Sequence, residues 1–178
     1  MTLTLPRLPR PLGLAARPLP LPPLNLFLGA VTRRMAQAHP VMLRRLGAHA
    51  ARRFLIDPVD LPWVFLLLPG DSRMTAHRRS HPPAHEARIA GPMSAFLAMM
   101  HGAEDGDALF FSRDLTVEGD TAAVLALRNA MDDAELDLTE EIAALSGPLA
   151  APLRRMLTGA ERVTGLALHR AETAGDWR

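Results

Sequence analysis

The sequence of 178 residues contains no cysteine, no lysine and no tyrosine. Without cysteine the chain forms no disulfide and supplies no thiolate to zinc or to an iron–sulfur cluster, which favours a reducing, cytoplasmic location. No uninterrupted apolar run reaches the roughly 18 residues of a membrane-spanning helix, so none is predicted. All 20 basic residues are arginines. Because alanine, leucine and proline are also abundant, we attribute this arginine bias to GC-rich coding and not to function.

Acidic residues are absent from the first part of the chain. Residues 1–56 carry nine arginines and no acid, whereas residues 104–141 carry two arginines and twelve acids. A basic front end followed by an acidic segment predicts two surfaces with different partners.

The chain divides into four expected regions. Residues 1–23 hold seven prolines and predict an extended arm, since proline fixes φ and removes a donor. Residues 24–56 predict basic amphipathic helices, broken at His39-Pro40 because the residue before proline leaves the α region; the second helical piece is expected from Val41 to Leu55. Residues 57–146 predict a mixed α/β domain, and residues 147–178 a C-terminal helical segment. The arginine-rich helices suit either an anionic membrane surface or packing on the domain with solvated arginines.

Four short strands are expected in the domain. Trp63–Leu68 is a continuous apolar run, typical of a strand buried on both faces. Residues 73–79 and 86–91, and the alternating Leu115 and Val117, predict the others. Ser94 is the expected N-cap of a helix that runs to His101.

A tight corner is expected after the last of these strands. Gly119 permits a sharp turn, and Asp120 or Thr121 can cap the next helix. That helix places Val124, Leu127 and Met131 on one face.

The stretch DALFFSRDLTVEGDTAAVLALRNAMDDAEL resembles the sterol carrier protein type of lipid-binding domain, and within it the bacterial accessory factor of oxygen-independent ubiquinone biosynthesis (the UbiT family). That family shows D-x-L-F-F-x-R-x-L-x-(V/I)-E-G-D-T, followed by a helix with N-x-M-D-A-x-E-L. The matching residues here are Asp107, Leu109, Phe110, Phe111, Arg113, Leu115, Val117, Glu118, Gly119, Asp120 and Thr121, then Asn129, Met131, Asp132, Glu135 and Leu136, with Asp133 inserted.

The resemblance is closest over Pro62–Leu138, less than half of the chain. It implies an α/β (α+β) fold, in which a curved, mostly antiparallel sheet of about five strands is covered by helices around an apolar tunnel. It also implies no catalysis, no cofactor, an isoprenoid quinone or other lipid as ligand, and iron–sulfur hydroxylation proteins related to U32 peptidases as partners. A cytoplasmic protein, peripheral at the inner membrane, would fit this role. The arm and the His-rich turn depart from the pattern.

The candidate ligand-binding residues are apolar side chains of the predicted helices, loop and strand, because cavities for lipids are apolar with few polar anchors. They are Phe96, Met99, Met100, Leu109, Phe110, Phe111, Leu115, Val117, Val124, Leu127 and Met131. Each of them would equally well fill a closed core. A protein–protein scaffold with a closed core and an acidic docking helix therefore stays open, as does a general phospholipid or fatty-acid carrier.

The sequence gives little support for a metal site, a catalytic centre or a nucleic-acid interface. His77, His81 and His85 recur every four residues, but Pro82-Pro83 break the helix that a metal site would need. Asp132 and Asp133 are successive positions that do not face each other on a helix, and no base partner is visible for them or for Glu135, so these acids predict a solvated face and not acid–base catalysis. No G-x-S-x-G surrounds a serine, so the sequence gives no sign of a hydrolase. The arginine pairs match no nucleic-acid motif.

Overall fold

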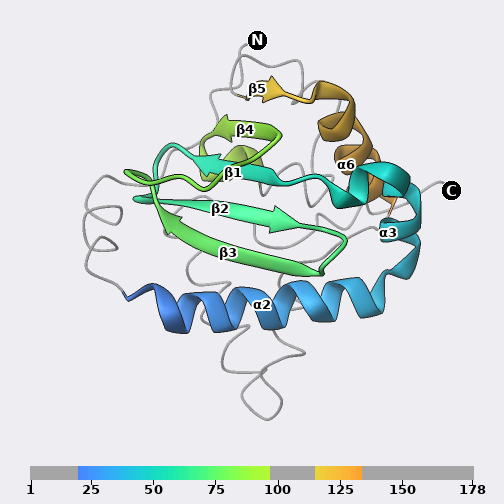
Figure 1. The fold of residues 1–178 in the computed structure, drawn as a ribbon, viewed down its shortest axis with the longest axis horizontal. Helices are drawn as coiled ribbons and strands as arrows, with labels where there is room; N and C mark the ends of the chain where they lie inside the picture. Colours follow the sequence, from blue (N-terminus) through green and yellow to red (C-terminus); the bar gives the residue numbers. More distant parts are fainter. Residues whose placement is uncertain (1–19, 97–114, 134–178) are drawn as a thin grey trace, which may run out of the picture.

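The computed structural model describes residues 20–96 and 115–133. Within these ranges the chain forms a five-stranded sheet in the order β3-β2-β1-β4-β5 (Figure 1). The strands are β1 (Phe54–Pro58), β2 (Trp63–Leu68), β3 (Arg73–Arg78), β4 (Ala87–Gly91) and β5 (Thr116–Gly119). Only the β1–β4 pair is parallel and the other three pairs are antiparallel. The expected mixed α/β fold with a mostly antiparallel sheet is confirmed.

Three helices and a 3₁₀ turn border this sheet. They are α2 (Leu21–Ala38), α3 (Pro40–Leu46), the 3₁₀ turn η1 (Gly47–Ala51) and α6 (Thr121–Asp133). Helix α2 runs along β3 at one edge of the sheet, while α3 packs against α6 (Figure 1). None of the helices in the described ranges is long and apolar enough to cross a membrane.

The first helices differ in extent from the expectation. The break at His39-Pro40 is confirmed. The extended arm was expected to reach residue 23, but α2 already begins at Leu21, since prolines in the first turn remove no intrahelical hydrogen bond. The prediction of one helix from Val41 to Leu55 is wrong, because α3 ends at Leu46.

The end of that predicted helix is a central strand. Phe54 and Leu55 are buried and belong to β1, which pairs with β2 on one side and β4 on the other. β1 continues through Asp57-Pro58, which the sequence suggested as a boundary. Burial between two strands outweighs the helical spacing of these residues, since local propensity is a weak signal.

The other strands follow the sequence pattern closely. β2, β3, β4 and β5 all lie where apolar runs or alternation predicted strands. β2 was expected to be buried on both faces, but only Trp63 and Val64 are buried and the rest is half-buried. Ser94 is not an N-cap: residues 93–96 are already helical, and Asp60 Oδ1 accepts the Met93 N–H at 3.0 Å.

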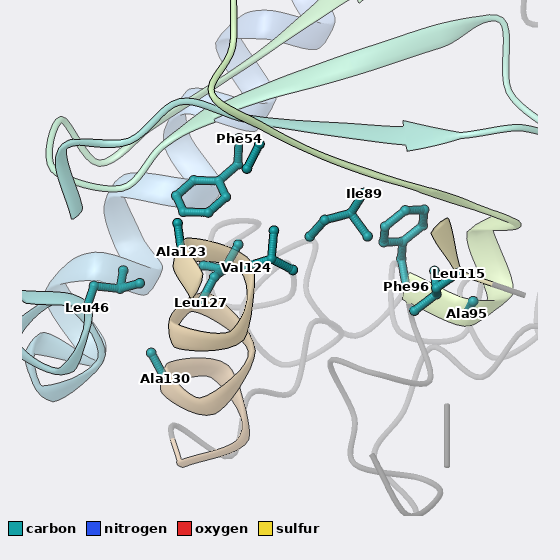
Figure 2. Packing of buried hydrophobic residues seen from close by; sticks show 11 residues of the cluster. Leu46, Phe54, Ile89, Ala95, Phe96, Leu115, Ala123, Val124, Leu127 and Ala130 are labelled. Atoms are coloured by element: carbon teal, nitrogen blue, oxygen red, sulfur yellow. The ribbon is translucent and has the colours of Figure 1, made fainter. Parts of the chain in front are cut away.

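The core lies between the inner face of the sheet and α3 and α6. Figure 2 shows Ala123, Val124 and Leu127 of α6 facing Phe54 of β1, with Ile89 and Phe96 beside them. These side chains are almost fully buried. The face of α6 that the spacing of Val124 and Leu127 predicted is therefore the face that packs.

The outer face of the sheet holds a charge cluster around Asp57, which is only 3% exposed. Its carboxylate accepts hydrogen bonds from Arg79 and Arg88, at 2.6 Å for Arg88 Nη2. Arg88 also pairs with Glu118 at 2.8 Å, and these hydrogen bonds, first to Asp57 and then to Glu118, raise the pKa of Arg88. Arg79 in addition donates to the Pro58 and Leu61 carbonyls. The cluster thereby connects strands β1, β4 and β5 with the turn after β1.

The corner between β5 and α6 forms as the sequence predicts. Gly119 has φ +81°, the left-handed region that favours glycine. The Asp120 N–H donates to the Glu86 carbonyl at 3.0 Å, and Asp120 Oδ1 accepts the Ala123 N–H at 3.0 Å. Asp120 is thus the N-cap of α6.

We expect Gly119→Ala to lower the free energy of unfolding by about 3 kcal/mol, the upper end for a strained backbone position, because a Cβ there would lie 2.2 Å from the Glu86 carbonyl oxygen. Gly47→Ala is the matched control, since Gly47 also has positive φ but nothing within 4 Å of a Cβ; it should cost about 1 kcal/mol, the lower end for a strained backbone position. Urea denaturation of both variants measures the difference. Equal costs would contradict the steric argument.

The Glu86–Arg53 pair predicts an acid-sensitive step in stability. Glu86 Oε2 accepts the Arg53 N–H at 2.8 Å and the Arg53 Nε–H at 3.2 Å. The side-chain hydrogen bond from Arg53, followed by the backbone one, lowers the pKa of Glu86 below its usual 4.5. The contribution of this pair to stability is therefore present above pH 4.5 and lost as the pH falls through the lowered pKa. Glu86→Gln should flatten the loss of stability below this pH in denaturation series, and an unchanged profile would contradict the assignment.

Candidate functional site

A cavity of about 330 Å³ lies between the inner face of the sheet and helices α2, α3 and α6. Apart from Thr32 and Ser72, its described lining is apolar. The lining residues are Phe27, Leu28, Val31, Thr32, Met35, Ala36, Met42, Leu43, Leu46, Ile56, Pro58, Phe65, Leu67, Pro69, Ser72, Met74, Ile89, Met93, Phe96, Leu127 and Met131.

Strand register explains why the sheet presents apolar side chains to the cavity. Ile56 of β1 pairs with Phe65 of β2 and with Ile89 of β4, and Leu67 of β2 pairs with Met74 of β3. Paired residues project from the same face of a sheet. These five side chains therefore form one apolar surface, which is the floor of the cavity.

Helix α2 forms the opposite wall. Leu28, Val31 and Met35 follow one another at intervals of three and four residues, which puts them on one side of the helix. All of them line the cavity. This periodicity was visible in the sequence, but there it could equally indicate a membrane-binding face, so the lining role of α2 was missed.

The cavity has almost no hydrogen-bonding chemistry to offer. Among its described lining residues only Thr32 and Ser72 carry polar side chains, and none is charged. The Thr32 hydroxyl donates to the Leu28 carbonyl at 2.8 Å, within the same helix. A polar or charged group would lose its hydration here without compensation. The site therefore favours hydrocarbon, and its described walls provide no acid, base or nucleophile poised for catalysis.

The size of the cavity limits what it can hold. A cavity of about 330 Å³ is near the lower limit of ligand sites, about 300 Å³. It fits a short hydrocarbon chain or one part of a long one.

The residues singled out in the sequence divide into three groups. Phe96, Leu127 and Met131 line the cavity. Leu115 and Val124 are buried in the core, and Val117 packs against it; none of these three is among the lining residues. The remaining candidates, Met99, Met100, Leu109, Phe110 and Phe111, lie outside the described residues.

The other candidate groups make contacts with residues that are close in sequence. His77 Nε2 lies 2.9 Å from Thr75 Oγ1, His81 Nδ1 lies 2.9 Å from Ser80 Oγ, and His85 Nδ1 lies 2.9 Å from the Pro83 carbonyl. Within residues 20–96 and 115–133 no cluster of three potential metal ligands forms. On α6, Asp132 pairs with Arg128 one turn earlier, at 3.4 Å.

A family model described as the SCP-2 sterol transfer family matches residues 32–132, which is more than half of the chain. The chain belongs to this family. The match spans β1 to β5, α3 and most of α6, and thus most of the cavity wall. It confirms the resemblance to a sterol carrier domain. No curated protein matches the sequence.

Solved structures of similar fold include other SCP-2 proteins. One is named a UbiJ-SCP2 ubiquinone synthesis protein, with 14% identity and a TM-score of 0.50, covering 66% of this chain and 96% of that one. Another is apo sterol carrier protein 2 of Yarrowia lipolytica, with 11% identity and a TM-score of 0.41, covering 59% and 89% of the two chains. At these identities the first likeness supports the fold alone, and the second carries no further weight.

We expect Ala36→Phe to reduce the binding of an apolar dye by at least roughly tenfold, since Ala36 lines the cavity and a phenyl ring would fill much of a small apolar site. Ala38→Phe is the matched control, because Ala38 is two residues further along the same helix and is exposed. Fluorescence titration with diphenylhexatriene gives both affinities. Equal affinities would show that the dye binds elsewhere.

Proposed function

We propose that this protein is a non-enzymatic carrier that holds the isoprenoid tail of ubiquinone precursors during oxygen-independent ubiquinone biosynthesis. The observation that supports this most directly is the apolar cavity, whose described lining offers no charge. An isoprenoid chain in water exposes apolar surface worth about 25 cal/mol per Å² on burial. Enclosing even part of the tail lets a soluble partner handle the ring.

The choice of ligand rests on two observations besides the cavity. The run from Asp107 to Thr121 resembles the UbiT family in the spacing of its Phe-Phe pair and its Glu-Gly-Asp corner. A structural neighbour also bears the name of a ubiquinone synthesis protein. Together they favour a prenylated quinone precursor over a sterol.

The partners follow from this role. A carrier without catalytic groups has to present its ligand to enzymes, and the resemblance suggests iron–sulfur hydroxylation proteins related to U32 peptidases. The ligand itself resides in the membrane, so a carrier in the cytoplasm that binds the inner membrane peripherally is the arrangement we propose.

A general phospholipid or fatty-acid carrier is the second candidate. It is favoured by the same lining, because none of the described wall residues provides a charged or strongly polar group that would recognise a particular head group. A scaffold with a closed core loses support, since the described residues enclose a cavity.

Native mass spectrometry of the purified protein, followed by lipid extraction, should find a prenylated quinone precursor bound. Deletion of the gene should lower ubiquinone only in cells grown without oxygen. Co-purification of phospholipid or fatty acid alone would favour the general carrier. A protein that carries no lipid, and takes up none on mixing, would contradict both candidates.

A further inference from the structure

Helix α2 is a wall of the cavity and contributes no residue to the described core cluster around α6. Its Leu28, Val31 and Met35 line the cavity, whereas the described core cluster is built from α3, α6, the helical turn at residues 93–96 and the sheet. Its neighbours are β3 along its length and α3 at its end. Moving α2 would therefore open the cavity and leave the core intact.

A hydrogen bond ties the first half of α2 to the edge strand of the sheet. Asn25 Oδ1 accepts the backbone N–H of Ala76 at 2.6 Å. β3 lies at the edge of the sheet, so this N–H points away from β2 and would otherwise need water or another partner. Besides this bond, α2 packs along β3.

The other end of α2 is joined to a fixed element. His39 lies between α2 and α3 with φ −121° and ψ 61°, outside the helical region. α3 begins at Pro40 and packs on α6 through the buried Leu46. The non-helical residue between these two helices is where a hinge would act.

The outer side of α2 combines exposed apolar and basic side chains. Leu26 is 75% exposed and Phe27 44%. Arg33 lies two helical turns after Leu26, Arg34 lies two turns after Phe27, and both arginines are also exposed. Phe27 in addition lines the cavity, so the mouth of the cavity coincides with this patch. The described chain up to Ile56 contains no acidic residue, which makes the patch complementary to an anionic lipid surface.

We propose that α2 is a lid over the cavity. It opens by breaking the Asn25–Ala76 hydrogen bond and turning about His39, when its outer side binds an anionic bilayer. In water, opening would expose the apolar side of α2 and is therefore opposed by the hydrophobic effect. At a bilayer that side finds hydrocarbon instead, so contact with lipid favours the open state. The proposal rests on the proposed lipid-carrier function.

The first test compares Asn25→Leu with Asn25→Asp. Leucine is of similar size but accepts no hydrogen bond, whereas aspartate keeps an acceptor oxygen at the same place. We would measure the transfer of diphenylhexatriene from vesicles of pure phosphatidylcholine, followed by energy transfer from tryptophan. Asn25→Leu should speed the transfer roughly two- to tenfold, as expected for the loss of one hydrogen bond, while Asn25→Asp stays close to the wild type.

The second test addresses the bilayer and does not depend on how well Asn25→Leu folds. Leu26→Ser removes an exposed apolar side chain from the patch, and Leu125→Ser is its control, because Leu125 is 47% exposed on α6. With vesicles of equimolar phosphatidylcholine and phosphatidylglycerol, Leu26→Ser should slow transfer several-fold and leave the amount bound at equilibrium unchanged. Leu125→Ser should transfer at the wild-type rate.

The outcomes separate this proposal from the one it rests on. If the wild type binds no probe even at equilibrium, the carrier function and the lid proposal both fail. If it binds normally, but Leu26→Ser and Leu125→Ser transfer at equal rates, the lid proposal is contradicted and the carrier function stands. Transfer that is equally fast from anionic and neutral vesicles, or unchanged in a folded Asn25→Leu protein, likewise contradicts the lid proposal.

Discussion

The inner face of the sheet presents more apolar surface than α3 and α6 cover. Where α6 meets the sheet, Phe54, Val124 and Leu127 are nearly inaccessible to solvent. Further along, Phe65, Leu67 and Met74 are only half-buried, and α2 spans the remaining gap without filling it. Protein interiors are normally as dense as organic crystals, and empty apolar volume costs stability. The tightly packed part of the molecule must therefore provide the stability that the part left open for a ligand does not.

The outer face of the same sheet holds the charged contacts between its strands. The carboxylate of Asp57 would be costly to bury alone, but the guanidinium groups of Arg79 and Arg88 pair with it. Arg88 continues to Glu118 on β5, and Arg79 donates to the carbonyls of Pro58 and Leu61. These contacts lie on the side of the sheet away from the cavity, whose described lining has no charged residue.

Where structure depends on neighbours in sequence, it could be predicted. The corner at Gly119 and Asp120 needs only a glycine that tolerates positive φ and a side chain that caps the next helix, and both signals are local. β1 could not be predicted in this way. Phe54 and Leu55 continue the apolar spacing of the preceding helix, and only pairing with β2, the next strand, and with β4, much later in the chain, makes them a strand.

An apolar cavity could be expected from the sequence, but the residues that line it could not all be predicted. Phe96, Leu127 and Met131 line the cavity, while their role in binding a lipid stays a prediction. Val124 has the same character as Leu127 and lies three residues away, and both are buried in the core cluster, but of the two only Leu127 also lines the cavity. Which side chain reaches the cavity is a property of tertiary packing, so the spacing in the sequence does not report it.

The residues that reveal the family and the residues that form the cavity are different. Glu118 pairs with Arg88, Gly119 turns the chain, and Asp120 caps α6, so each residue of the Glu-Gly-Asp corner has a structural task and none of them lines the cavity. The corner therefore marks the family through its role in the fold, and not through contact with a ligand in the cavity. Ligand preference has to reside in the shape of the cavity walls. Helix α2 supplies six of the lining residues, so it is the wall most able to change that shape. Substitutions on α2 should consequently change which lipid is bound, whereas substitutions in the corner should change only whether the domain folds.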